Sequence, residues 1–279
     1  MLKNILRKLL RPALQWYCNL PILHANTENA LKRILFYWPQ YVQYQFRRKC
    51  VPSRWRPGYF SQNGQDRVIA DALFPNLEGG CFVDIGAHDG VTASNTCYLE
   101  RERQWRGLAV EPVPGNFAKL TAARKCQAVH ACVAAADGET EILVVEGYAD
   151  VLSGIPDHFD RNHLSRIDRE IAEHGGRKTI ARVPCYRLST LLARSNIRDI
   201  DYLSIDCEGA DLTVLRSIDF AKVRIRALTV ENPGFKGFKL LQAHGFQLVA
   251  VAGGDDIYVQ RQFGPLAEAF RIRELDGAA

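Results

Sequence analysis

The stretch CFVDIGAHDG, residues 81–90, decides the fold. Cys81–Ile85 is a short apolar run typical of a buried strand, and Gly86 and Gly90 stand in the loop that follows it. Residues 94–103 then have the pattern of a helix. A strand, a glycine loop and a helix in succession are typical of a parallel α/β sheet, in which ligands bind beyond the carboxyl ends of the strands.

The same alternation continues along the chain. Strands are predicted at 107–111, 128–134, 200–206 and 227–231, and helices at 116–124, 210–217 and 235–244. After a turn at Asp137 and Gly138, residues 139–146 are expected to pair antiparallel with 128–134. Residues 246–252 and 256–261 are expected to form a terminal hairpin. We therefore predict a Rossmann-like, doubly wound α/β sheet, mostly parallel with a C-terminal antiparallel hairpin and right-handed crossovers.

The composition is typical of a folded domain preceded by a basic segment. The chain has 279 residues and 47% hydrophobic residues, enough for a sizeable core, which excludes a mainly disordered protein. The net charge of +5 is uneven: residues 1–57 hold eleven Lys and Arg against one acid, Glu28, which leaves −5 on the remainder. We predict a basic amphipathic helical extension over 1–57, a Rossmann-like domain over 58–263 and a tail over 264–279.

Two interpretations of the extension stay open. Its apolar and basic faces at helical spacing fit a peripheral membrane contact, and they equally fit packing on the domain or on a second copy as a homodimer. The eight cysteines contain no CxxC pair, which indicates free thiols in a reducing cytoplasm. Since the chain has no apolar run of about 18 residues and no signal-peptide pattern, we expect a cytoplasmic protein, at most peripheral at the inner membrane face.

Acidic residues follow several predicted strands and should meet at one rim of the sheet. They are Asp84, Glu111, Asp206, Glu208 and Glu231. The glycine loop is not GxGxxG, so a nicotinamide dinucleotide is disfavoured, whereas Glu111, 27 residues beyond Asp84, is suitably placed to accept both hydroxyls of a ribose. The N-terminus of the helix after the loop favours a ligand that carries a carboxylate, and the nearby acidic residues favour a ligand that also carries a positive charge. These features together predict S-adenosylmethionine as the cofactor.

Residues 58–263 resemble the FkbM family of S-adenosylmethionine-dependent O-methyltransferases. The resemblance rests on motifs in one order and spacing: Ser61-Gln-Asn-Gly-Gln-Asp66, Phe82 to Gly90, Val110-Glu-Pro112, Asp201 to Asp211, Val230-Glu-Asn232 and Gly245-Phe246. The first of these is the Ser-Gln-x-Gly-Gln-Asp signature of one branch. The family's fourth motif ends in Glu-Gly-x-Glu, whereas this chain has Asp211, and the basic extension has no counterpart.

The resemblance implies roles for individual residues. The predicted cofactor-binding residues are Ser61, Gln62, Gln65, Asp66, Asp84, Gly86, His88, Gly90, Glu111 and Asp137. Within this set, Glu111 would contact the ribose, Asp137 the adenine, and the residues of 61–66 would close over the methionine end. Other interpretations remain: residues 61–66 as a helix cap with Ser61 as the N-cap, Asp137-Gly138 as a turn, and His88 as a packed loop residue.

Asp206, Glu208 and Glu231 are the predicted catalytic residues. Methyl transfer is an in-line displacement, and a sugar hydroxyl needs a base or a metal to remove its proton. Asp206 is the first candidate base, with Glu208 and Glu231 to orient it. Alternatively, all three carboxylates hold Mg²⁺ or Ca²⁺, which prefer oxygen ligands.

Residues 151–177 are expected to be an irregular substrate lid. Within it we predict that His158 and Arg161 bind substrate, while His163 is expected to be solvated. The arginines of this stretch suit an anionic acceptor such as a phosphorylated or lipid-linked glycan. Acidic residues interleave with them, so the stretch has no clean basic stripe and nucleic acid is not an expected partner.

The resemblance implies transfer of a methyl group to a hydroxyl of a carbohydrate or glycolipid, in cell-surface polysaccharide or glycolipid biosynthesis. Two alternatives remain. One is O-methylation of a secondary metabolite; the other is a membrane-associated assembly factor that binds S-adenosylmethionine without turnover. A factor of that kind would keep Glu111 and the glycine loop but lose the carboxylates beside the acceptor, and Asp206, Glu208 and Glu231 are all present.

Overall fold

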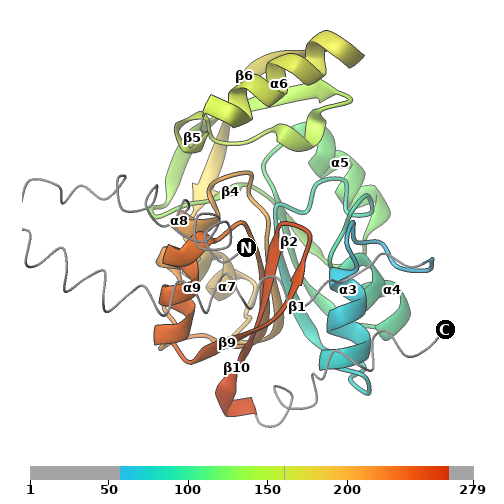
Figure 1. The fold of residues 1–279 in the computed structure, drawn as a ribbon, viewed down its shortest axis with the longest axis vertical. Coiled ribbons are helices and arrows are strands. Elements are labelled where there is room, and N and C mark those ends of the chain that lie inside the picture. Colours follow the sequence, from blue (N-terminus) through green and yellow to red (C-terminus); the bar gives the residue numbers. More distant parts are fainter. Residues whose placement is uncertain (1–56, 160, 264–279) are drawn as a thin grey trace, which may run out of the picture. The chain divides into compact units, whose positions relative to one another are not determined.

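The computed structural model describes residues 57–159 and 161–263 (Figure 1). All the described residues belong to one compact unit. The extension and tail predicted from the sequence lie outside the described residues, Pro57 excepted. Within the described part of the chain, no helix is long and apolar enough to cross a membrane, and all six cysteines are free thiols.

A seven-stranded sheet forms the centre of the domain and confirms the predicted Rossmann-like fold. Its order is β3 (Gln127–His130), β2 (Arg106–Glu111), β1 (Cys81–Ile85), β7 (Asp199–Ile205), β8 (Arg224–Glu231), β10 (Asp255–Gln260) and β9 (Phe246–Ala252). The first five strands pair in parallel, and β10 pairs antiparallel with both neighbours. The parallel strands therefore end at one rim, as the sequence predicts.

Helices cover both faces of this sheet (Figure 1). One face carries α3 (Gln65–Arg67), the π-helix η1 (Val68–Leu73), α4 (Cys97–Arg103) and α5 (Pro114–Ala123). The other carries α7 (Leu188–Arg194), α8 (Asp211–Ser217) and α9 (Gly234–Ala243), and η4 (Arg261–Phe263) follows the last strand. The apolar side chains of η1 pack in one core with Phe82, Tyr202 and Ile257 of the sheet, all of them fully buried. That core fixes which side chains of the strands point toward η1.

A second sheet corrects the prediction for residues 128–147. Its order is β4 (Cys132–Val133), β6 (Gly176–Tyr186) and β5 (Gly138–Gly147). The predicted strand 128–134 is two strands, because the chain leaves the main sheet after His130. Residues 139–146 pair not with it but with β6, in antiparallel register from Gly138 opposite Cys185 to Gly147 opposite Gly176.

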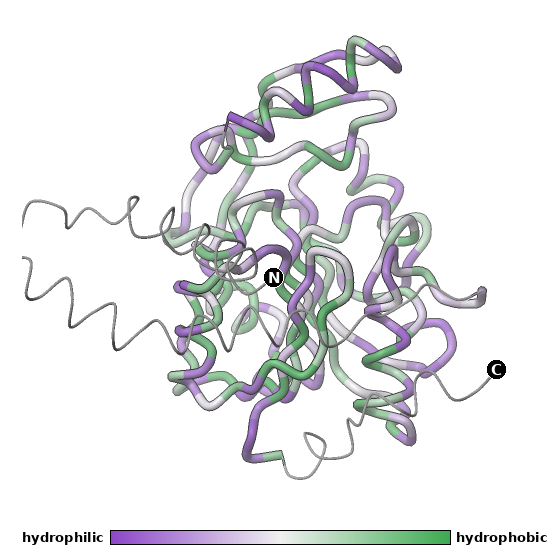
Figure 2. Tube along the Cα trace, in the orientation of Figure 1, coloured by the Kyte–Doolittle hydropathy of each residue, from purple (hydrophilic) through white to green (hydrophobic). Residues whose placement is uncertain are grey.

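The predicted irregular lid is partly regular. It contains η2 (Asp150–Leu152), which begins one residue before the predicted lid, then η3 (Pro156–His158) and the fourteen-residue helix α6 (Arg161–His174). Figure 2 shows hydrophilic and hydrophobic residues alternating along α6. Only Ile167 of this helix is fully buried, against Val145 and Leu152. The helical spacing of Ile167 and Ile171 is an amphipathic signal already present in the sequence, but the many charged residues around it led us to expect an irregular segment.

Candidate functional site

A cavity opens at the carboxyl ends of β1, β2 and β7. Its empty space of about 980 Å³ includes some open solvent. Six of the predicted site residues line it: Asp84, Gly86, His88, Glu111, Asp206 and Glu208. The structure thus brings these six residues together around one cavity, as the sequence predicts. The role of each residue remains a proposal.

Gly86 lets the loop after β1 pack closely against the loop after β7. Its backbone has φ +86°, and a Cβ at this position would lie 1.7 Å from the carbonyl oxygen of Asp206. The amide of Asp206 also donates to the carbonyl of Ile85 (3.0 Å). Gly90 is different: it does not line the cavity, and its Cβ would meet Leu120 of α5 at 2.6 Å. The first glycine therefore joins the loops, and the second lets a helix approach.

Asp84 is a buried brace in the cavity floor. Its side chain is on the face that η1 and α4 cover, and the hydroxyl of Thr96 donates to it (2.6 Å). Burial raises the pKa of Asp84, while the Thr96 hydrogen bond and the charge of Arg124 oppose that rise. Residues 94–96, which we predicted as helical, precede α4 and form a loop, and Ser94 and Asn95 line the cavity.

Glu111 is held by two backbone amides. His88 N donates to one of its oxygens (2.8 Å) and Val113 N to the other (2.8 Å). Burial raises the pKa of Glu111 to about 7, although both hydrogen bonds act to lower it. A carboxylate has about four acceptor sites, so the two oxygens retain capacity for further donors such as hydroxyls.

Asp150, which no sequence pattern indicated as a site residue, also lines the cavity. One Asp150 oxygen is 3.3 Å from His88 Nε2 and 3.9 Å from Lys119 Nζ. Asp150 stands in η2, between β5 and α6, so this connection contributes to the cavity wall together with Ser153 and nearby residues. No local motif surrounds Asp150, and only the β5–β6 pairing brings it to His88.

Asp206, Glu208 and Glu231 form what we call the carboxylate cluster. One oxygen from each lies within 4.8 Å of the others. Burial raises the pKa of Asp206 well above its ordinary value, and the neighbouring charge of Glu231 adds to this. Burial, with the same neighbour, raises the pKa of Glu208 to about 8. Asp206 and Glu208 line the cavity, and Glu231 stands behind them at the end of β8.

Asp211 braces the loop that carries two members of the cluster. Its oxygens accept hydrogen bonds from the amides of Cys207 (2.9 Å) and Gly209 (3.1 Å). Burial raises the pKa of Asp211 to about 7, against those hydrogen bonds. The shorter side chain at this position therefore serves loop geometry at the start of α8.

His163, which we expected to be solvated, lies at the carboxylate cluster. Its Nδ1 is 3.7 Å from a Glu208 oxygen, and Nε2 is 3.1 Å from the carbonyl of Leu152. The ring stacks on Phe159, with centroids 4.1 Å apart. The two predicted substrate residues differ: Arg161 is exposed at the start of α6, and the backbone of His158 packs against Gly209. Spacing along an unrecognised helix was the signal that could have identified His163.

Residues 61–66, which we call the signature loop, do not line the cavity. Asp66 accepts hydrogen bonds from the amides of Phe60 (2.7 Å) and Ser61 (3.1 Å), and from the Ser61 hydroxyl. Gln62 is exposed. Ser61 forms a β-bridge to Ala93, which does line the cavity. Gly64 is the N-cap residue of α3, and the Ser61 hydroxyl accepts a hydrogen bond from the amide of Asp66 (3.3 Å) in the first turn of that helix, which fits the cap interpretation.

Asp137 is also placed outside the cavity. Its carboxylate accepts hydrogen bonds from the amide of Arg187 (2.7 Å) and the hydroxyl of Thr190 (2.8 Å) at the start of α7. These hydrogen bonds lower its pKa. Asp137 and Gly138 form the entry to β5, so the turn interpretation fits, and the predicted adenine contact is not supported.

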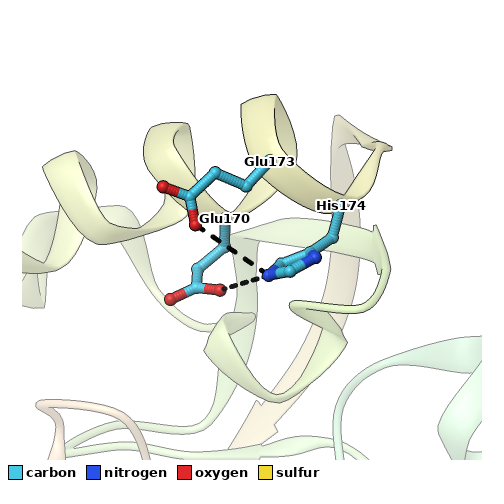
Figure 3. Close-up of side chains that lie close together, drawn as sticks. All are labelled: Glu170, Glu173 and His174. Atoms are coloured by element: carbon cyan, nitrogen blue, oxygen red, sulfur yellow. Dashed lines mark ion pairs between the residues drawn. The ribbon is translucent and has the colours of Figure 1, made fainter.

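A further group of possible metal ligands lies on α6 (Figure 3). The Nε2 atom of His174 is 3.7 Å from Glu170 and 3.9 Å from Glu173. Glu173 and His174 are exposed, and none of the three lines the cavity. Glu170 and His174 are one turn apart at the end of α6, a spacing at which an acidic and a basic side chain stabilise a helix.

The chain matches one protein family and is similar to solved methyltransferase structures. The model of the Methyltransferase FkbM domain matches residues 84–253. The precorrin-6y C5,15-methyltransferase of Geobacter metallireducens GS-15 is similar in structure (TM-score 0.36, 11% identity, covering 75% of this chain and 91% of that chain). So is a TehB-like SAM-dependent methyltransferase of Corynebacterium glutamicum ATCC 13032 (TM-score 0.36, 12% identity, covering 84% and 97%). No curated protein matches the chain significantly. The matched residues include the glycine loop and the whole carboxylate cluster.

Proposed function

The chain belongs to the FkbM methyltransferase family and is an S-adenosylmethionine-dependent methyltransferase, and we propose that its acceptor is a hydroxyl of a carbohydrate or glycolipid. The observation that supports a hydroxyl acceptor is the carboxylate cluster, with its oxygens within 4.8 Å of one another beside the cavity. Carboxylates are acceptor-only groups when ionised, suited to binding the several hydroxyls of a sugar. The cell-surface polysaccharide or glycolipid pathway is part of the same proposal.

The cofactor would occupy the cavity. The residues fit it: Glu111 offers oxygens for ribose hydroxyls, and the glycine loop lets the backbone approach closely. The apolar wall by Val113, Cys132 and Val133 suits a purine ring. When bound, S-adenosylmethionine supplies an electrophilic methyl group on a sulfonium.

The chain's part in the reaction is to hold the acceptor oxygen in line and take its proton. Asp206 lines the cavity and has a raised pKa, so its ionised form is a stronger base than an ordinary aspartate. A cation nearby favours the ionised form, so an occupied cavity would prepare Asp206 to accept the proton. Glu208 and Glu231 would orient Asp206 and the acceptor. In the proposed role, the proton ends on Asp206.

A divalent cation is the alternative way to activate the hydroxyl. The carboxylate cluster fits one, because three hard oxygen ligands converge and Mg²⁺ or Ca²⁺ prefers such ligands. Asp206, Glu208 and Glu231 would hold it, and it would lower the pKa of the acceptor hydroxyl.

The test is incubation with methyl-labelled S-adenosylmethionine and a cell-envelope extract, with Mg²⁺, with Ca²⁺ or with EDTA. We expect label in a carbohydrate or glycolipid fraction, and loss of label with EDTA only if a metal acts. Label in small hydroxylated metabolites instead would favour the alternative of secondary-metabolite O-methylation. Tight cofactor binding by calorimetry without label under any metal condition would favour the non-catalytic assembly factor.

The proposed membrane contact or homodimer involves residues 1–57, which lie outside the described residues apart from Pro57. Support for it comes from the charge and spacing of that segment in the sequence. A glycolipid acceptor would place the enzyme at the inner face of a membrane.

Cofactor affinity should rise with pH through the ionisation of Glu111. Its pKa of about 7 means that at pH 6 most Glu111 is protonated and has lost acceptor capacity toward ribose hydroxyls. We expect the Kd for S-adenosylmethionine to fall about tenfold between pH 6 and pH 8, because the ionised fraction of Glu111 rises from roughly one eleventh to roughly ten elevenths. Glu111→Gln should bind more weakly at pH 8 and show a much flatter profile, as measured by calorimetry.

Glu100→Gln is the matched control for this profile. Glu100 is buried to a lesser degree, and hydrogen bonds from the 124–126 segment lower its pKa despite that burial. It therefore stays ionised across the range, and its variant should keep the wild-type pH profile. An unchanged profile in Glu111→Gln would assign the pH dependence to another group.

A further inference from the structure

The signature loop is tied to a side of the site other than the cofactor cavity. The Nε2 atom of Gln65 donates to an oxygen of Asp255, 190 residues further along the chain (2.7 Å). The other end of the same amide, Oε1, accepts from the backbone of Asn63 (2.9 Å). Gln65 and Asp255 are 4% and 5% exposed, so the hydrogen bond between them is shielded from water. The Gln65 side chain is thus fixed at both ends and aimed at one carboxylate.

Asp255 stands beside the carboxylate cluster. It is the first residue of β10, directly opposite Glu231 in the antiparallel pair of β10 and β8. Side chains alternate along strands, and the registers of β7, β8 and β10 put Asp206, Glu231 and Asp255 on the same face. The charges of Asp255 and Asp206 interact. Three neighbouring strands therefore each bring one carboxylate to this rim.

The signature loop is also fixed in place on two sides. At the turn between β9 and β10, a Cβ on Gly253 would lie 2.3 Å from the side-chain amide nitrogen of Asn63, so the hairpin and the loop are in close contact. On the other side, Ser61 bridges to Ala93 in the cavity wall. The loop thereby connects the hairpin that carries Asp255 to the wall of the cavity.

We infer that Gln65 and Asp255 are positioning residues for the acceptor side of the site, in which Gln65 holds Asp255 so that Asp206 and Glu231 keep their places. The inference rests on the proposed function of the carboxylate cluster. Like charges on adjacent strands repel each other, and a hydrogen bond to a charged group is one of the stronger polar contacts. Without the amide donor, a buried carboxylate turns toward other polar groups and disturbs its neighbours.

The sequence resemblance and this inference make opposite predictions for the cofactor. If the signature loop closes over the methionine end, Gln65→Leu weakens S-adenosylmethionine binding. If Gln65 positions the acceptor side, the Kd for S-adenosylmethionine by calorimetry stays within about twofold of wild type, while methyl transfer to the envelope extract falls at least about tenfold. Asp255→Asn should act in the same direction.

Three comparisons make the test specific. Gln260→Leu removes a glutamine that donates to the His244 carbonyl (2.8 Å) at the opposite end of β10, and Asp256→Asn changes a buried aspartate on the other face of the strand. Both controls should transfer methyl groups at the wild-type rate. The double variant Gln65→Leu with Asp255→Asn should lose no more transfer than the worse single variant, since residues that act as a unit are not additive.

Hydrogen exchange supplies a readout that is independent of turnover. Gln65→Leu should speed amide exchange in residues 205–208 and 229–231, and Gln260→Leu should not. Cofactor binding weakened about tenfold, wild-type transfer, or unchanged exchange in Gln65→Leu would each overturn the inference. Should wild-type protein transfer no label to the extract, the proposed function fails, and the exchange and calorimetry results still decide this inference.

Discussion

Asp206→Asn should lower the rate of methyl transfer by about 10² to 10⁴, the usual contribution of a general base, while S-adenosylmethionine binding is retained. The amide has almost the same shape as the carboxylate but cannot take a proton. The backbone contacts that hold this position, from Asp206 N to Ile85 and from Gly86 to the Asp206 carbonyl, remain in the variant. The measurement is single-turnover transfer of labelled methyl groups, with calorimetry for the cofactor.

Asp201→Asn is the control for this variant. Asp201 lies on the same strand, β7, at its far end from the cavity, and its carboxylate pairs with Arg226 (2.8 Å). Its loss should change stability and leave the rate of transfer intact. If Asp206→Asn transfers methyl groups at the wild-type rate, Asp206 is not the base, and the divalent cation or Glu208 becomes the agent that activates the hydroxyl.

Gly86→Ala should destabilise the domain by at least about 3 kcal/mol, through backbone strain and overlap together. Position 86 has φ +86°, and the new methyl group would lie 1.7 Å from a backbone oxygen, an atom that cannot rotate away. Either the loop after β1 or the loop after β7 must move, and both line the cavity. The expected result is a lower urea midpoint and loss of cofactor binding.

Gly115→Ala is the matched substitution. Gly115 is near the start of α5, and a Cβ there would meet no atom from outside its own helical turn within 4 Å. In a helix, alanine is more favourable than glycine by up to about 1 kcal/mol, so this variant should be neutral or slightly stabilising. Equal urea midpoints for the two variants would show that the loops adapt to a side chain at position 86.

The parts of the site that sequence predicts well are those built by local rules. Asp84, Glu111 and Asp206 each stand at or next to the carboxyl end of an apolar strand, and parallel strands end at one rim, so their convergence follows from strand order alone. The resemblance to a family implies which cofactor binds, and the structure confirms the predicted sheet at whose rim that cofactor would bind. These predictions need only the strand pattern and the rule that ligands bind at this rim.

The parts that sequence does not predict depend on distant pairing. Residues 139–146 have the same alternation whether they pair with 128–134 or with β6, and only β6, some forty residues later, completes their register. His163 and Asp150 reach the site through that second sheet and its helix. Gln65 meets a residue 190 positions away, which no spacing within the motif indicates.

The second sheet is an insertion that begins and ends at almost the same point. The chain enters it at β4 and leaves it at the end of β6, and these two segments pair side by side, Cys132 with Cys185 and Val133 with Tyr186. An insertion whose two ends lie side by side can be lengthened, shortened or replaced without altering the register of the seven-stranded sheet. The rim of the seven-stranded sheet, with Asp84, Glu111 and Asp206, can therefore stay unchanged while the far part of this insertion diverges, whereas β4 and η2 are constrained because they also line the cofactor cavity.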